Sequence, residues 1–333
     1  LIVLDPVTTE IAKLADYHIK LRPGTNVAVL NMMLHFIIKA KLHNVDFVRD
    51  RTEGFEKFIK EIERQDVDQL AKIAGVDKEM VKQAAIAYAT AKNSMEFHGL
   101  GVTEHEQGSK TVMLIADLAM ITGNIGRKGV GVNPLRGQNN VQGAADMGCQ
   151  PHQGAGYFNV AEEKNQKYYS EKYGVTHPTK PGLKIPEMFD AAIKKDLKAV
   201  WIIGEDIVQT DPDSSHVIKA MNSLELLVVQ EIFMSETAKL ATVVLPGTTF
   251  LEKDGTFTNT ERRIQRVNRA VPPLPGTKPD GVIVTDMMQK LGFDQPTYDA
   301  DKMLKEIADV VPFFKGVTRE RLGKLGLQWP VQE

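Results

Sequence analysis

One arginine stands among glycines and carboxamides in the stretch NPLRGQNNVQGAADMG, residues 133–148. The guanidinium of Arg136 is a planar fork of N–H donors, which matches both oxygens of a carboxylate. The amide side chains that follow, from Gln138 to Gln142, donate and accept hydrogen bonds without adding charge. By pattern the stretch is neither helix nor strand. We expect a site for a small anion beside a polar cofactor, with a surface salt bridge of Arg136 as the alternative.

Four predicted strands end in a glycine, a carboxylate or an amide. The strands and their endings are 1–4 followed by Asp5, 95–98 followed by 99–101, 199–203 followed by Gly204, Glu205 and Asp206, and 225–229 followed by Gln230 and Glu231. Ligands of open parallel sheets bind outside the carboxyl ends of the strands. The sequence therefore predicts a polar crevice at these ends. Asp5 suits a ribose diol there, and its alternative role is the turn that Asp-Pro commonly starts.

Asp280 has two candidate roles. It directly precedes a helical stripe of apolar residues, and as a helix N-cap it would contribute ~1 kcal/mol. It would also serve as an acceptor for a ligand with two adjacent N–H donors, as guanine has. On the residues alone we favour the cap. Thr210 and Asp211, which precede Pro212, present the same two alternatives. No glycine spacing forms GxGxxG or a P-loop, so nicotinamide and ordinary nucleoside triphosphate sites lack their signatures.

Short β-rich apolar runs alternate with longer helical stretches, which indicates an α/β fold with parallel sheets. A further short strand is predicted at 242–245. The predicted helices are 26–42, 54–64, 78–92, 109–121, 185–195 and 281–291. We expect the polar stretch 158–182 to be irregular, and 252–265 to form a hairpin with a solvated basic end.

The chain repeats a short order of motifs. The matches are LIVLD at 1–5 with LLVVQ at 226–230, AKLA at 12–15 and 238–241, and PGT at 23–25 and 246–248. Both copies read strand, polar end, helix, strand and PGT. We interpret them as two related lobes with one ligand crevice each. The alternative is coincidence among common residues.

Composition excludes several classes of function. With 42% hydrophobic and 25% charged residues, the 333-residue chain is typical of a globular protein of two domains. A net charge of −2 does not favour electrostatic binding of nucleic acid. No apolar run is long enough for a membrane span. A single cysteine, Cys149, excludes a disulfide framework within the chain. His105 and His152 lack a second ligand at metal spacing, so we expect no metal ligand in this chain.

Three motifs carry a resemblance to a known family. The stretches GVNPLRGQNNVQGAADMG at 131–148, WIIGEDIVQTDPD at 201–213 and VVLPGTTFLEKDGTFTNTERRIQ at 243–265 resemble the catalytic subunit of molybdenum- or tungsten-dependent formate dehydrogenases. Those enzymes belong to the molybdopterin oxidoreductases that carry two pterins. The resemblance covers essentially the whole chain. The motif that contains the arginine points to the formate branch.

The resemblance implies a fold and a pair of cofactors. Two related, doubly wound, mainly parallel-sheet α/β domains, here 1–138 and 139–333, would each hold one molybdopterin guanine dinucleotide, with one molybdenum or tungsten between the two cofactors. Arg136 matches the substrate-orienting arginine of the family. The residues that match cofactor contacts are Asp5, Gly24, Asn26, Leu100 and Glu104 for one dinucleotide, Gly204, Glu205, Asp206, Thr210, Gln230, Glu231 and Asp280 for the other, and Gln138 for a pterin near the metal.

The implied activity is the reversible two-electron oxidation of formate to CO2. The electrons would pass to an iron–sulfur subunit or domain. One alternative is another two-pterin oxidoreductase, such as a nitrate reductase. The other is a non-catalytic module that binds the cofactor or a partner. The resemblance does not distinguish molybdenum from tungsten, because both metals use the same pterin.

The chain departs from the family pattern at three positions. Val7 stands where a basic residue is expected, Glu104 where an amide is frequent, and Gly281 where an aromatic residue is usual. These 333 residues also lack the family's 4Fe-4S domain, its Cys or selenocysteine metal ligand with an adjacent His, and its C-terminal domain. Since the chain begins LIVLDP, without an initiator Met or a signal peptide, we expect an internal fragment. We predict a cytoplasmic location.

Overall fold

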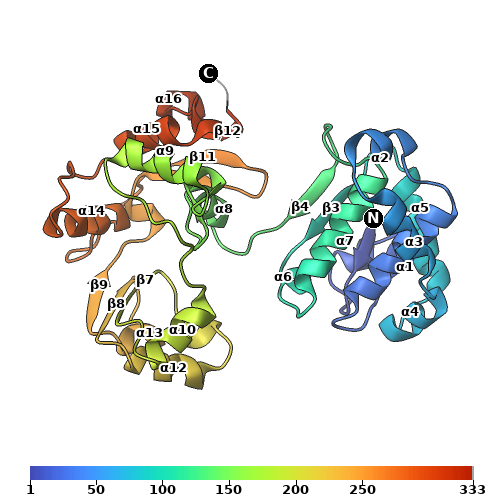
Figure 1. Cartoon of the computed structure of the whole chain (residues 1–333), viewed down its shortest axis with the longest axis horizontal. Coiled ribbons are helices and arrows are strands. Elements are labelled where there is room, and N and C mark those ends of the chain that lie inside the picture. The colour runs from blue at the N-terminus through green and yellow to red at the C-terminus, as the bar shows by residue number, and fades with distance from the viewer. Residues whose placement is uncertain (332–333) are drawn as a thin grey trace. The chain divides into compact units, whose positions relative to one another are not determined.

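The computed structural model describes residues 1–331 (Figure 1). The chain forms two compact units, Leu1–Gly137 and Gln138–Glu333. This division falls one residue before the boundary expected after residue 138. Both units contain parallel strand pairs together with helices, which confirms the α/β class predicted from the sequence pattern.

The first unit is built around one buried helix, α1. Its side chains Met32, Leu34 and Ile37 are fully buried, and helices α4, α5 and α7 pack against it. The elements of this unit are β1 (Ile2–Leu4), η1 (Ala12–Leu14), β2 (Tyr17–Ile19), α1 (Asn26–Lys39), α2 (Val45–Arg51), α3 (Phe55–Glu63), α4 (Val67–Ala74), α5 (Lys78–Thr90), β3 (Met95–His98), α6 (Leu100–Thr103), α7 (Gly108–Ile121) and β4 (Gly131–Pro134). Strand β1 pairs with β2, and β3 with β4, both in parallel.

Local signals set the ends of the helices around α1. The side chains of Asn44, Asp66 and Asp77 accept hydrogen bonds from backbone N–H groups in the first turns of α2, α4 and α5. Each such cap contributes about 1 kcal/mol to helix stability. Gly75 ends α4 at a φ of 69°, a left-handed conformation that glycine adopts without strain.

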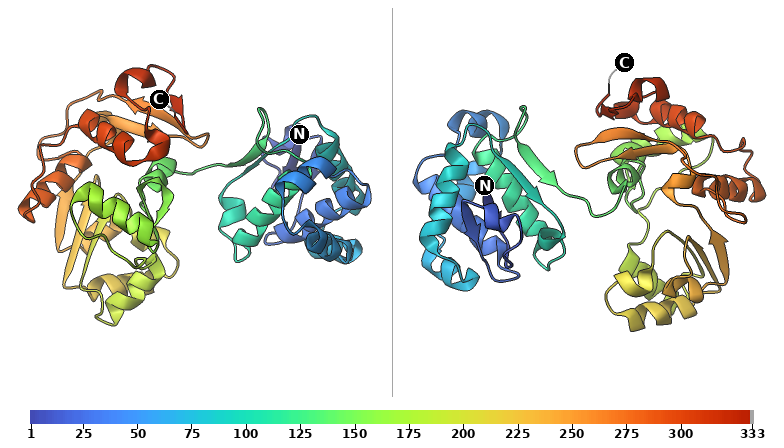
Figure 2. Two further views of the ribbon diagram at one scale, coloured as in Figure 1. Left: turned by 45° about the horizontal axis from the view of Figure 1, so that its top comes forward. Right: turned by 180° about the vertical axis from the view of Figure 1, so that it is seen from behind.

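The second unit contains two hydrophobic cores, and its helices and strands are drawn from two further sides in Figure 2. Its elements are α8 (Val141–Asp146), β5 (Gln153–Gly154), η2 (Ala155–Tyr157), β6 (Phe158–Asn159), α9 (Glu163–Tyr173), α10 (Ile185–Ile193), β7 (Ala199–Ile203), α11 (Ile207–Thr210), α12 (Ser214–Asn222), β8 (Leu226–Glu231), α13 (Glu236–Lys239), β9 (Val243–Pro246), η3 (Phe250–Glu252), β10 (Gly255–Thr258), β11 (Arg263–Val267), α14 (Asp280–Lys290), α15 (Ala300–Val310), η4 (Pro312–Phe314), α16 (Arg319–Leu322) and β12 (Leu327–Gln328). One core joins the parallel sheet β7-β8-β9 to helices α10 to α13. The other joins the antiparallel sheet β10-β11-β12 to α9, α15 and α16.

The sequence repeat corresponds to the same local structure in both units. Strand β1 pairs in parallel with β2, and β8 pairs in parallel with β9. In both pairs the partners are 15 residues apart, as Ile2 with Tyr17 and Val228 with Val243. After each PGT motif the chain enters a long helix, directly at α1 in the first unit and after the β10–β11 hairpin at α14 in the second. The repeat therefore gives both units a parallel strand pair with the same register spacing, followed by a long helix.

Several local expectations were wrong. The stretch 133–148 contains the end of β4 and all of α8. The stretch 158–182 contains β6 and helix α9, whose Tyr169 is buried in the second core. Strand β8 runs to Glu231, two residues beyond its expected end.

The hairpin expected at 252–265 is present as β10 and β11. In the part of the chain that the structure describes, no helix is both long enough and apolar enough to cross a membrane.

Candidate functional site

The carboxyl ends of the three parallel strands in the second unit lie in register. Ile203 of β7 pairs with Gln230 of β8, which in turn pairs with Leu245 of β9. Beyond the strand ends, the backbone N–H of Gly204 donates to the carbonyl oxygen of Gln230 over 2.9 Å. The N–H of Gly247 donates to the carbonyl oxygen of Glu231 over 3.1 Å. The predicted polar ends therefore lie side by side on one sheet edge.

Asp280 joins this edge from the first turn of α14. Gln230 Nε2 donates to Asp280 Oδ1 over 2.7 Å, and the ammonium of Lys253 donates to Asp280 Oδ2. A Cβ on Gly247 would stand 3.2 Å from Asp280 Oδ1, so the carboxylate approaches the backbone closely. The N-cap of α14 is Pro279, and no side chain caps the helix. The cap predicted for Asp280 is wrong, because its carboxylate is held by Gln230 and Lys253 instead.

Two buried polar atoms at this edge have no hydrogen-bond partner. They are Oε1 of Gln230 and Oγ1 of Thr248, in side chains that are 1% and 4% exposed. Buried polar atoms are nearly always hydrogen-bonded in folded proteins. Together with the close approach at Gly247, these atoms fit a polar ligand that completes the site. We therefore find the edge chemically suited to a nucleotide base or ribose.

Sequence reasoning missed Lys253 and Thr248 as members of this site. Both lie in the PGTTFLEK stretch that follows β9, so the motif contained the signal. The motif does not predict that Lys253 contacts Asp280, which lies 27 residues further along the chain. The neighbouring Glu252 accepts from the backbone and hydroxyl of Thr249 and from the backbone of Leu274, which lowers the pKa of its carboxyl.

The space beside Gly281 is filled by Tyr298. A Cβ on Gly281 would come within 2.2 Å of Cε2 of that ring. Burial raises the pKa of the Tyr298 hydroxyl, and the negative charge of Asp280 raises it further. The chain thus supplies an aromatic ring from the segment before α15, beside the position at which the resemblance led us to expect an aromatic residue.

The residues after β7 form a hydrogen-bonded loop. Asp206 Oδ1 accepts from the backbone and hydroxyl of Thr237, over 3.0 and 2.6 Å, and its Oδ2 accepts from Gln209. Partial burial opposes ionisation of Asp206, but these hydrogen bonds outweigh it and hold the pKa below its usual range. The hydroxyl of Thr210 donates to Glu205 over 2.6 Å. Gly204 has a φ of 65° and leaves open space at its Cα.

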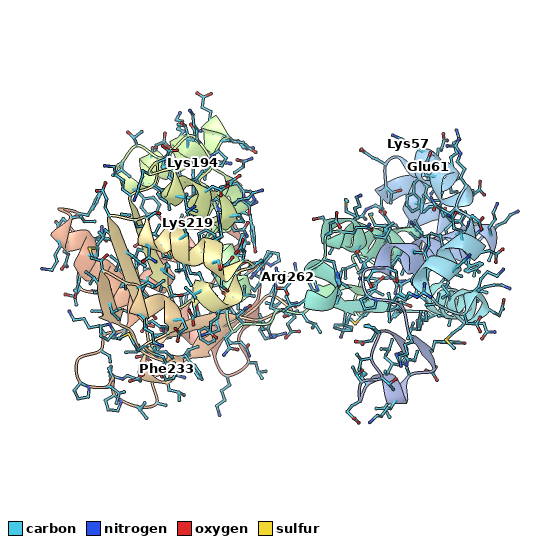
Figure 3. The ribbon with its side chains drawn as sticks, turned by 90° about the horizontal axis from the view of Figure 1, so that it is seen from below. Lys57, Glu61, Lys194, Lys219, Phe233 and Arg262 are labelled. Carbon is cyan, nitrogen blue, oxygen red and sulfur yellow. The ribbon has the colours of Figure 1, made fainter. Side chains whose placement is uncertain are left out.

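The apolar segment that follows β8 is exposed. Ile232, Phe233 and Met234 are 46%, 76% and 63% accessible, and Phe233 is labelled in Figure 3. Sequence reasoning did not single out these residues. They adjoin Glu231, at the end of the strand that carries Gln230.

In the first unit, the predicted cofactor residues lie at the end of β1 and the start of α1. Asp5 Oδ1 accepts from the backbone of Val7 over 2.7 Å, so the turn expected for Asp-Pro is present. Asn26 Nδ2 donates to the carbonyl oxygen of Gly101 over 3.5 Å, which joins the start of α1 to the short helix α6 that follows β3. The remaining predicted residues are exposed or half-exposed around these two places: Gly24, Leu100 and Glu104.

Arg136 lies two residues beyond the end of β4. The N–H of Leu135 donates to the carbonyl oxygen of His98 over 2.7 Å, which holds this segment against the end of β3. Burial lowers the pKa of His98, and the positive charge of Arg136 lowers it further. Both effects disfavour the protonated form of His98. Gln138 is exposed and begins the second unit.

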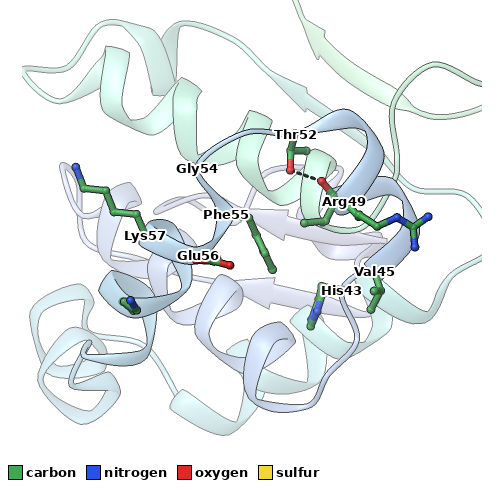
Figure 4. Close-up of a pocket in the computed structure, with 10 residues that line it drawn as sticks. His43, Val45, Arg49, Thr52, Gly54, Phe55, Glu56 and Lys57 are labelled. Carbon is green, nitrogen blue, oxygen red and sulfur yellow. Dashed lines mark hydrogen bonds between the residues drawn. The ribbon is translucent and has the colours of Figure 1, made fainter.

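A cavity of about 730 Å³ lies elsewhere in the first unit, between α2 and α3 (Figure 4). It is lined by His43, Phe55 and several charged side chains, among them Lys57 and Lys60. No predicted site residue lines it. Among the described residues there is no group of three His, Cys, Asp or Glu side chains that would hold a metal ion.

Comparison with known proteins defines the family. Residues 1–290 match the sequence profile of the molybdopterin oxidoreductases. The chain is 45% identical over 99% of its length to the F420-dependent formate dehydrogenase subunit alpha of Methanocaldococcus jannaschii, of which it covers 49%. It is 41% identical over its whole length to formate dehydrogenase H of Escherichia coli, of which it covers 47%. The chain belongs to the molybdopterin oxidoreductase family, as its motifs predicted, and spans about half the length of the curated relatives it matches.

A solved structure shows the same fold. Acetylene hydratase from Pelobacter acetylenicus superposes with a TM-score of 0.75 over 96% of this chain and 46% of its own, at 21% identity. At that identity the match supports the fold class alone.

Proposed function

We propose that this chain is the middle part of the catalytic subunit of a molybdopterin-dependent formate dehydrogenase. The observation that carries the proposal is identity of 41–45% with formate dehydrogenases over nearly the whole chain. The whole enzyme would oxidise formate reversibly to CO2, a two-electron reaction. An iron–sulfur subunit or domain would take the electrons. A 4Fe-4S cluster would lie in a region preceding this segment, and we place the enzyme in the cytoplasm.

Two crevices would bind two molybdopterin guanine dinucleotides. In the second unit, Asp280 and Gln230 would hold one guanine, and Glu231 its ribose. The unpartnered Oε1 of Gln230 and Oγ1 of Thr248 support a polar ligand at this place. Gly204, Glu205, Asp206 and Thr210 would line the same crevice. In the first unit the corresponding residues would be Asp5, Gly24, Asn26, Leu100 and Glu104, with Gln138 beside a pterin.

Arg136 would orient formate. When bound, the cofactor with its molybdenum or tungsten supplies the redox chemistry, and the protein supplies position and charge. The two N–H donors of the guanidinium would bind both formate oxygens, each charge-assisted bond contributing about 1.5–3 kcal/mol. Burial and the charge of Arg136 both lower the pKa of His98, and Arg136 would supply positive charge at the ends of β3 and β4.

The test is Arg136→Lys in the full-length enzyme. A lysine keeps the charge but loses the planar fork, so we expect kcat/KM for formate to fall by at least tenfold with pterin content unchanged. Arg127→Lys is the matched control, because Arg127 lies before the same strand and binds Asn93 and Asn124 instead. Unchanged formate kinetics in Arg136→Lys would overturn the assignment.

Metal and pterin analysis of the full-length protein separates the alternatives. One molybdenum or tungsten with two pterins per chain supports the family's cofactor set. Absence of both from a folded protein would favour the non-catalytic module. Reoxidation of the reduced centre by nitrate, without a response to formate, would favour a nitrate reductase.

A further inference from the structure

Lys253 and Asp280 form a half-buried ion pair with hydrogen-bonding capacity to spare. Their side chains are 27% and 35% exposed. The ammonium of Lys253 has three N–H donors, of which one meets Asp280 and another lies 3.5 Å from the carbonyl oxygen of Thr248. Asp280 accepts from Lys253 and from Gln230, and each carboxylate oxygen accepts more than one bond. The pair therefore presents one donor next to several acceptors.

This order of donor and acceptors matches one base edge. Guanine presents O6 as an acceptor, followed by the N1–H and 2-amino donors. We propose that Lys253 is a specificity-determining residue that donates to O6 of guanine while Asp280 accepts from N1–H and the 2-amino group. The proposal rests on the proposed function, which places the guanine of a molybdopterin dinucleotide at Asp280.

The other purines fit the pair badly. Adenine would set its 6-amino donor against the ammonium of Lys253 and its N1 acceptor against the carboxylate of Asp280. Hypoxanthine keeps O6 and N1–H but leaves the carboxylate without the 2-amino donor. A buried polar group that loses its partner is costly, so the pair would reject adenine more strongly than hypoxanthine. Lys253 would therefore discriminate between bases by the group at position 6, which Asp280 does not contact.

The two contacts can be measured separately with nucleotide analogues. The probes are GMP, IMP, AMP and 6-thio-GMP, whose sulfur is a weak acceptor while both N–H donors remain. We would produce the full-length protein without its cofactor and follow hydrogen–deuterium exchange of the peptide that begins α14. Protection at increasing probe concentration gives an affinity for this crevice alone.

The expected ratios follow from the assignment. The wild-type protein should bind GMP about tenfold more tightly than 6-thio-GMP, and AMP most weakly. Lys253→Met should bring the GMP to 6-thio-GMP ratio close to one and leave the GMP to IMP ratio unchanged. Lys253→Arg should keep a preference for O6. Lys278→Met is the matched control, because Lys278 is more exposed and pairs with Asp286 of α14 instead of Asp280, and it should keep both ratios.

Three results would overturn the proposal. They are equal affinity of the wild type for GMP and 6-thio-GMP, an unchanged ratio in Lys253→Met, and an equal loss of GMP, IMP and AMP binding in that variant, which would show contact with a phosphate. The first needs no variant, so it decides the matter even if Lys253→Met fails to fold. Formate turnover of the cofactor-loaded enzyme is measured separately. Guanine selectivity without formate turnover would overturn the proposed function alone.

Discussion

The ring of Tyr298 occupies the space that a side chain at Gly281 would fill. A Cβ at position 281 would come within 2.2 Å of the ring, and the two residues come from α14 and from the segment that leads to α15. Asp280, the neighbour of Gly281, carries the carboxylate of the candidate base site. The glycine and the tyrosine therefore pack as a pair, and the glycine directly follows Asp280 in the chain.

Gly281→Ala should destabilise the second unit, because the new methyl group has no space. Overpacking of this kind costs about 1–3 kcal/mol. We expect Tyr298→Ala to relieve the clash, so that the double variant is more stable than the sum of the two single effects predicts. Urea unfolding of the four proteins measures the coupling. Gly255→Ala is the control, because a Cβ there meets open space, and strictly additive effects at 281 and 298 would contradict the packing.

Glu96 should make the stability of the first unit depend on pH. Burial raises the pKa of its carboxyl to about 7, although the hydroxyl of Tyr88 donates to one of its oxygens. In the unfolded chain the pKa is about 4.3. Between these values the folded state binds more protons, so stability falls as the pH rises through this window and the loss is complete above the folded pKa.

Glu96→Gln removes this titration. The variant should gain stability relative to the wild type as the pH is raised from 5 to 8, and urea unfolding at several pH values measures the difference. Glu106→Gln, at an exposed position, is the control and should follow the wild type. A constant difference between Glu96→Gln and the wild type over this range would show that Glu96 does not titrate as described.

Removal of the Arg136 charge should raise the pKa of His98. Burial is the main cause of the low pKa of His98 and Arg136 is the second, so Arg136→Gln should shift it upward but leave it below the usual value. NMR titration of the His98 ring measures the shift. Arg127→Gln should leave the titration unchanged. The same midpoint in the wild type and Arg136→Gln would place the guanidinium away from His98.

Asp146→Ala should strongly destabilise the second unit. Asp146 is fully buried and accepts from Gln142, the hydroxyl of Tyr157 and the indole N–H of Trp329. Its loss removes the acceptor of three hydrogen bonds, although Gln142 Nε2 also donates to the hydroxyl of Tyr157, and each hydrogen bond to a charged group contributes about 1.5–3 kcal/mol. We expect a loss above about 3 kcal/mol in urea unfolding, followed by tryptophan fluorescence. A cost under 1 kcal/mol would contradict this network, and Asp294→Ala on the surface is the control.

The strand ends were accessible to sequence reasoning because the signals are local. Asp5 and Gly204 each follow an apolar run, so they show where the strand ends. Parallel pairing brings the ends of neighbouring strands together. The hairpin at 252–265 was predicted for the same reason, since turn residues lie between its strands. Helix α9 was not predicted because its sequence is mostly polar. Tyr169 on that helix packs into a core whose other members are distant in the chain.

The sequence by itself determined the α/β class, the repeat and the family, because each depends on residue types at short, fixed spacings. Only the tertiary structure decided which side chains meet. Gln230 and Asp280 are 50 residues apart and hydrogen-bonded, and the cap expected for Asp280 gave way to that bond and to Lys253. From the neighbouring residues alone, a carboxylate such as that of Asp280 has several possible hydrogen-bond partners of similar energy. The packing of α14 against the end of β8 selects among them, because it brings a buried amide and an ammonium within reach of Asp280.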